Sequence, residues 1–129
     1  MANRKKAYKD MTNEEKIEEK RLKIRKLFKD TPREKLQFAE GLIYQFAVTT
    51  VTLERLVEEL NKGDVVENFK QGSQEIRREN PALRSYNTTI KSFAALSKSL
   101  LELLPAKMQK QFGEELMNFA TQPPRGARE

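Results

Sequence analysis

One long amphipathic helix, expected over residues 31–62, constrains this chain more than any other feature. Thr31-Pro32-Arg33-Glu34 is a helix start, because the threonine side chain can cap free amides, proline fits the first helical position, and glutamate can reach back as in a capping box. Apolar residues then recur at alternating three- and four-residue steps, with Thr50 as the one polar member of the seam: Leu36, Ala39, Ile43, Phe46, Leu53, Val57 and Leu60. We expect the helix to end near Lys62, with Gly63 as a left-handed cap.

A second long helix is expected over residues 80–104, where Asn80 can cap and Pro81 can occupy the first helical position. Its apolar stripe ends before Pro105 and consists of Leu83, Tyr86, Ile90, Phe93, Ala94, Leu100, Leu101 and Leu104. Helices of about 30 and 24 residues measure about 45 and 36 Å. The sequence therefore predicts an elongated antiparallel helical hairpin.

The apolar faces of this hairpin are wider than one partner helix can cover. In the first helix, Phe38, Leu42 and Leu56 lie on one side of the seam, and Ala47 and Val51 lie on the other. Large exposed apolar patches normally mark an interface, so we expect a homo-oligomer. The residues expected at its subunit interface are Phe38, Leu42, Phe46, Leu53, Leu56, Tyr86, Phe93 and Leu100.

Composition excludes many kinds of enzyme. The chain has no cysteine and no histidine, which rules out a zinc finger, a thiol nucleophile and a Ser-His-Asp triad. Its five glycines are too scattered for a phosphate-binding loop. We expect no catalytic residues, no metal and no cofactor. The absence of a long apolar run predicts a cytoplasmic protein with neither a membrane span nor a signal peptide.

Basic charge is concentrated at the two ends of the chain, whose formal net charge is +6. Residues 1–30 hold eleven bases and six acids, residues 31–80 seven and nine, and residues 81–129 seven and four. Residues 2–10 are expected to form a disordered basic arm. Thr12-Asn13-Glu14-Glu15 is a second capping box, opening a helix to about Lys29.

The apolar face of this N-terminal helix is narrow, comprising Ile17, Ile24, Leu27 and Phe28. Two interpretations of its charge remain open, a DNA-contact surface and an ordinary solvated face. The candidate DNA-binding residues are Arg4, Lys5, Lys6, Lys20, Arg21, Lys23, Arg25 and Lys26.

The remaining segments complete an all-α fold with a small insert. Short β-favouring runs at 63–69 and 73–76 surround Lys70-Gln71-Gly72 and indicate a β-hairpin, with an irregular loop as the alternative. After Pro105, the spacing of Met108, Phe112, Leu116 and Phe119 predicts a short helix, and residues 121–129 are expected to be a disordered tail. We divide the chain into a basic segment (1–30), a helical-hairpin oligomerisation core (31–104) and a helix with tail (105–129).

Two stretches of the second helix resemble the C-terminal half of small terminase subunits of tailed bacteriophages. The first runs from Glu79 to Phe93 and contains Asn-Pro-Ala-Leu at 80–83 and Tyr-Asn at 86–87. The second, Leu100 to Pro105, ends in Leu-Leu-Pro. The helix from Thr31 is similar more loosely, while the arm and tail are not.

The resemblance implies a DNA-packaging component without enzymatic activity. Such a protein forms a closed homo-oligomeric ring, binds double-stranded viral DNA and regulates the ATPase and nuclease of the large terminase subunit in the cytoplasm of the infected bacterial host. Many family members place a helix-turn-helix domain before the core, yet only one clear helix precedes Thr31 here. A ring could still bind DNA by summing many weak phosphate contacts.

Two other functions fit the same residues. One is a coiled-coil adaptor or assembly protein that binds only proteins and uses its charge for solubility. The other is a basic helical DNA-binding regulator.

Overall fold

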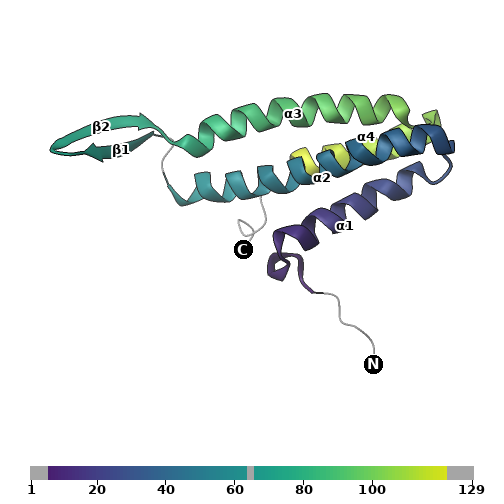
Figure 1. Ribbon diagram of the computed structural model, residues 1–129, viewed down its shortest axis with the longest axis horizontal. Coiled ribbons are helices and arrows are strands. Elements are labelled where there is room, and N and C mark those ends of the chain that lie inside the picture. Colours follow the sequence, from purple (N-terminus) through teal and green to yellow (C-terminus); the bar gives the residue numbers. More distant parts are fainter. Residues whose placement is uncertain (1–5, 64–65, 122–129) are drawn as a thin grey trace.

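The computed structural model describes residues 6–63 and 66–121 (Figure 1). The helices are α1 (Asn13–Arg25), α2 (Arg33–Lys62), α3 (Pro81–Leu103) and α4 (Ala106–Thr121). Two short 3-10 turns, Tyr8–Asp10 and Lys26–Phe28, flank α1, and strands β1 (Val66–Gln71) and β2 (Gln74–Glu79) join α2 to α3. The predicted all-α fold with a small β insert is confirmed.

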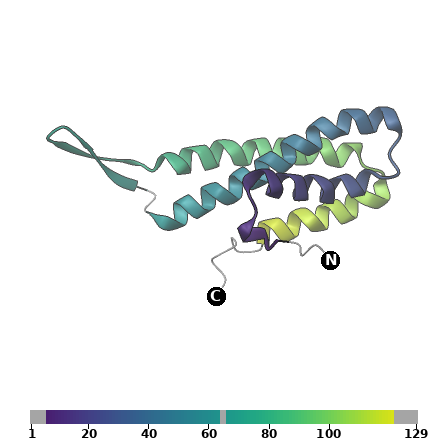
Figure 2. The same cartoon turned by 60° about the horizontal axis from the view of Figure 1, so that its bottom comes forward.

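Helices α2 and α3 lie side by side and antiparallel, as predicted (Figure 1). At the end distant from the β-hairpin, α1 and α4 pack against this pair, so one end contains four helices and the other only two (Figure 2). The two-helix end continues into the projecting β-hairpin (Figures 1 and 2). The molecule is therefore an elongated stalk with a thicker, four-helix base.

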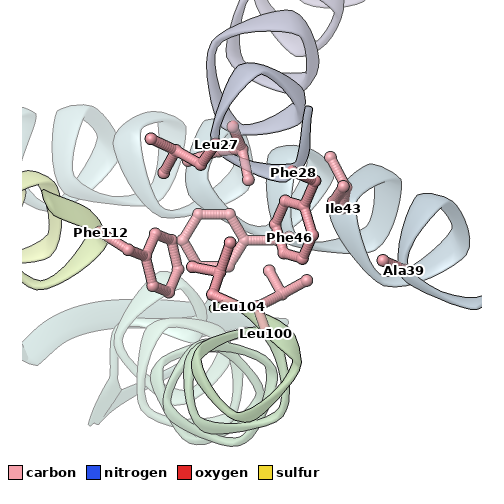
Figure 3. Close-up of a cluster of buried hydrophobic side chains, with 9 residues drawn as sticks. Leu27, Phe28, Ala39, Ile43, Phe46, Leu100, Leu104 and Phe112 are labelled. Atoms are coloured by element: carbon pink, nitrogen blue, oxygen red, sulfur yellow. The ribbon is translucent and has the colours of Figure 1, made fainter. Parts of the chain in front are cut away.

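The main core fills the four-helix base (Figure 3). Phe46 of α2 lies at its centre, with ring centroids 5.3 Å from Phe93 and 5.8 Å from Phe112. With Phe112 of α4, buried residues from the other three helices and from the turns after α1 and α3 complete it: Ile24, Leu27, Phe28, Ala39, Ile43, Leu100 and Leu104. Burial of such side chains contributes about 1.5 to 3 kcal/mol each, so this base holds most of the hydrophobic stabilisation.

Two predicted helix starts are confirmed by their side-chain caps. The Thr12 hydroxyl accepts a hydrogen bond from the Glu15 amide, and the Glu15 carboxylate accepts one from the Thr12 amide, which completes the capping box. The Asn80 side chain accepts from the Ala82 amide at 3.0 Å, ahead of Pro81. Each cap satisfies amides that have no partner within the helix.

The predicted caps at both ends of α2 are wrong. The helix begins at Arg33 after Pro32, without a side-chain cap, and the Thr31 hydroxyl is buried with no hydrogen-bond partner among the described residues. Thr31 belongs to the preceding turn, because its amide donates a hydrogen bond to the Phe28 carbonyl, and its side chain does not cap α2. At the other end, α2 stops after Lys62 as expected, but Gly63 is extended rather than left-handed.

The N-terminal segment is more ordered and its helix shorter than predicted. Helix α1 ends at Arg25, and Lys26–Phe28 form a 3-10 turn that tucks Leu27 and Phe28 into the core. Tyr8–Asp10 form a 3-10 turn where a disordered arm was expected, whereas residues 1–5 lie outside the described part of the chain.

The β-hairpin prediction is confirmed, with the strands shifted toward the C-terminus. Gln71 pairs with Gln74, so Gly72 and Ser73 form a two-residue loop, and Phe69 is opposite Ile76. Gly72 has φ of 65°, a value that residues with a side chain rarely adopt. Two-residue hairpin turns require such a positive φ at this position. Helix α4 is likewise present with Phe112 fully buried, while the predicted tail from 122 onward lies outside the described residues.

Candidate functional site

Most of the predicted DNA-binding residues that the structure describes are held in ion pairs within the chain. Five salt bridges account for them: Lys6 with Glu15, Lys20 with Glu54, Arg21 with Glu18, Lys23 with Glu115, and Arg25 with Glu40. Lys26 is exposed beside them, and Arg4 and Lys5 lie outside the described residues. The basic character of α1 is thus largely neutralised by neighbouring carboxylates.

Three of these pairs fasten α1 to other helices rather than to itself. Lys20 reaches Glu54 on α2 at 3.1 Å, and Arg25 reaches Glu40 on the same helix at 3.3 Å. Lys23 reaches Glu115 on α4 at 3.4 Å. Exposed pairs of this kind contribute at most about 1 kcal/mol each, so their main effect is on local charge.

The ion pair within α1 shifts the pKa of both of its members. Arg21 binds the Glu18 carboxylate through two guanidinium nitrogens, at 2.8 and 2.6 Å. The hydrogen bond from Arg21 lowers the pKa of Glu18 and, in return, Glu18 raises the pKa of Arg21. A phosphate would have to compete with this bidentate contact for the Arg21 side chain.

Tyr8 anchors the N-terminal arm in a small polar cluster. Its hydroxyl donates to the Glu54 carboxylate on α2, and its ring lies 5.1 Å from the amino groups of both Lys16 and Lys20. Cations over an aromatic face are attracted by its negative potential. From Lys6 onward, the arm is therefore attached to α1 and α2, and one more lysine of the basic segment, Lys16, is engaged.

The residues predicted for the subunit interface fall into two groups. Phe46, Leu53 and Leu100 are buried in the core of a single chain, and Phe93 and Leu42 pack against that core. Burial contradicts the interface prediction for the first three, because each is at most 4% exposed in the single chain and offers no surface to a neighbouring subunit. Leu56 and Tyr86 are half-buried on the stalk, and Phe38 is 67% exposed.

The outward face of α2 is a second candidate surface, which the apolar periodicity of the helix did not predict. Residues 41–53 contain no charged side chain, although about a third of the whole chain is charged. Tyr44 is 49% exposed there, Gly41 and Gln45 are also exposed, and Val48 and Thr52 are half-buried. The sequence contains this signal as the uncharged run of thirteen residues between Glu40 and Glu54.

Helix α3 presents the opposite kind of outward face. Its exposed charges from Pro81 to Leu101 are Arg84, Lys91 and Lys98, all basic, and the one acid of the helix is the exposed Glu102 near its end. The sequence placed the principal DNA contacts in residues 1–30, where lysine and arginine are densest, and offered Arg84 only as an alternative contact; Lys91 and Lys98 were not predicted.

Comparison with protein-family models, with curated proteins and with solved structures gave no match. The resemblance to small terminase subunits therefore rests on the stretches at 79–93 and 100–105. In the structure they span the end of β2, the Asn80 cap, and the beginning and end of α3. None of the helices in the described residues is long and apolar enough to cross a membrane.

Proposed function

We propose that this chain is a small terminase subunit, which assembles into a closed ring of identical subunits, binds double-stranded viral DNA and regulates the ATPase and nuclease of the large subunit. The observation that carries the proposal is the uncharged outward strip of α2 within residues 41–53, formed by Gly41, Tyr44, Gln45, Val48 and Thr52. A helix face with an exposed tyrosine and no charge is suited to contact with another protein surface.

The projecting β-hairpin supports assembly for a second reason. A two-stranded hairpin is at best marginally stable alone in water. Here β1 and β2 pair only with each other within the described residues, at the end of the stalk (Figure 1). A neighbouring subunit in a ring would supply the packing surface that the hairpin otherwise lacks.

A ring requires two different patches on each subunit, one for each neighbour. The outward strip of α2 and the flank around Phe38 supply one patch, and the half-buried stalk residues Leu56 and Tyr86 supply the other. Repetition of the subunit would also multiply weak phosphate contacts, which gives affinity for DNA without strong sequence preference.

Native mass spectrometry of the full chain tests the ring. The expected result is one dominant species of many subunits, unchanged over a range of micromolar concentrations. A folded, monodisperse monomer under the same conditions would contradict the proposal. Addition of the assembled ring to a large terminase subunit should alter its rate of ATP hydrolysis, and an unchanged rate would count against the regulatory role.

An adaptor that binds only proteins is the second candidate, and the ion pairs of α1 are the specific observation that favours it. The two functions differ in retention on DNA. A terminase subunit should bind duplex DNA at low salt and release it as salt rises, whereas the adaptor should not bind at any salt concentration.

A further inference from the structure

The outward face of α3 carries a regular repeat of exposed basic and hydroxyl residues. Three basic residues recur at intervals of seven, each followed by an exposed serine: Arg84-Ser85, Lys91-Ser92 and Lys98-Ser99. Seven residues are about two helical turns, so neighbouring cations lie about 10.5 Å apart and the set spans about 21 Å along the helix. The drift of about 20° per seven residues keeps all three on one side. Phe93 and Leu100, which pack toward α2, lie on the other side.

These cations are less neutralised than those of α1. Lys91 and Lys98 are exposed and form no ion pair within the described part of the chain. Arg84 has one long contact, 3.8 Å to Glu79, and its side chain remains 86% exposed. With no acid between positions 80 and 101, a polyanion approaching this face meets positive charge along most of the helix.

The other residues of this face favour a phosphate backbone over a protein partner. Those exposed between the cations are small or polar: Asn87, Thr88, Ala94 and Ala95. Protein interfaces usually centre on buried aromatic or aliphatic side chains, and this face offers none. Small residues instead allow a bulky backbone to approach closely, and serine hydroxyls can donate to phosphate oxygens.

We propose that the outward face of α3 is the surface that contacts the backbone of duplex DNA. Arg84, Lys91 and Lys98 pair with phosphates, and the adjacent serines donate hydrogen bonds to phosphate oxygens. The contact does not read sequence, because it reaches no base edge. This inference rests on the proposed DNA-binding function, and it places the principal contacts on α3 instead of α1.

Two variants with equal charge loss distinguish the contributions of α3 and α1 to DNA binding. R84Q/K91Q/K98Q removes the α3 cations, and K23Q/R25Q/K26Q removes three predicted α1 contacts, so each lowers the formal net charge from +6 to +3. Binding to a fluorescein-labelled duplex of mixed sequence is measured by polarisation from 50 to 200 mM salt. Light scattering verifies that both variants keep the oligomeric state of the parent.

The α3 variant should bind about tenfold or more weakly at the lowest salt and lose up to about 2.7 from the slope of log affinity against log salt per contacting subunit. The α1 variant should stay within about threefold of the parent, because two of its three cations, Lys23 and Arg25, are already paired with carboxylates. This pattern supports the inference.

Three results would overturn it. Equal losses in both variants would show that net charge, not this face, governs binding. Loss confined to the α1 variant would return the contacts to the N-terminal segment. Unchanged DNA affinity of the α3 variant with lost binding to a large terminase subunit would assign the face to a protein. If the unmodified protein forms a ring but does not bind duplex DNA at low salt, the proposed DNA-binding function itself is wrong. In the three results above, by contrast, only the assignment to α3 is wrong.

Discussion

Thr31 and Thr50 are both buried, yet only one has a partner for its hydroxyl. The Thr50 hydroxyl donates to the Ala47 carbonyl at 2.9 Å, whereas the Thr31 hydroxyl has no partner among the described residues. A buried unsatisfied polar group costs about 1 to 3 kcal/mol, while a made hydrogen bond contributes about 1 kcal/mol.

The same substitution should therefore act in opposite directions at these two sites. Thr31→Val should raise the free energy of unfolding by about 1 kcal/mol, and Thr50→Val should lower it by a similar amount. Urea denaturation at one fixed protein concentration measures both, since assembly makes stability concentration-dependent. Destabilisation by Thr31→Val would mean that its hydroxyl has a bonding partner after all.

Gly72 and Gly113 form a second pair with opposite expectations. A Cβ at Gly113 in α4 would meet nothing within 4 Å, and alanine favours a helix by about 0.8 to 1 kcal/mol. Gly72 has φ of 65°, and a residue with a side chain in this left-handed conformation destabilises the backbone by about 1 to 2 kcal/mol. In hydrogen exchange, Gly113→Ala should increase protection of residues 106–121, and Gly72→Ala should decrease protection of residues 66–79. A loss of protection in α4 would show that Gly113 is needed for packing.

The capping box of Thr12 and Glu15 stabilises the start of α1, and its contribution depends on pH. The hydrogen bond from the Thr12 amide, followed by that from Lys6, lowers the pKa of Glu15 below its ordinary 4.5. Since the folded pKa is the lower one, the stabilisation is present above the unfolded pKa and is lost as pH falls through the folded pKa.

Acidification below about pH 4.5 should thus fray the first turn of α1 before the four-helix base unfolds. Amide exchange of residues 13–16, followed by NMR on acid titration, measures this. Glu15→Gln keeps an acceptor but carries no charge, so the Glu15 contribution to the pH dependence should vanish. Thr12→Ala should cost about 1 kcal/mol at neutral pH. An acid transition of the same size in Glu15→Gln would place its origin in another carboxylate.

Assembly is the property that depends on the largest surfaces. Tyr44→Glu puts a charge in the uncharged strip of α2 at a side chain that is 49% exposed in the single chain. The fold should persist, and the oligomer should dissociate into smaller species, because burying an unpaired carboxylate at an interface costs several kcal/mol. Gln111→Glu is the matched control, since Gln111 is exposed on α4, outside both proposed patches.

Size-exclusion chromatography with light scattering gives the mass of each variant, and circular dichroism gives its helix content. The proposed strip predicts a mass change for Tyr44→Glu alone. If both variants keep the mass of the parent, subunits meet through some other surface.

The sequence by itself determined the helices, the two side-chain caps at Thr12 and Asn80, and the turn glycine of the hairpin. These features are local: helical periodicity, amide capping and positive φ depend on residues within a few positions of one another. The end of α2 near Lys62 and the break at Pro105 could be predicted for the same reason.

Tertiary structure decided which apolar and charged side chains remain available for binding. Phe46 and Phe38 both follow helical spacing in α2, yet one lies between two aromatic rings and the other is 67% exposed. The ion pairs from Lys20 to Glu54 and from Lys23 to Glu115 join residues distant in sequence, so a count of bases could not foresee them. Burial and neutralisation are set by which helices pack together, because a face has no partner until another helix covers it.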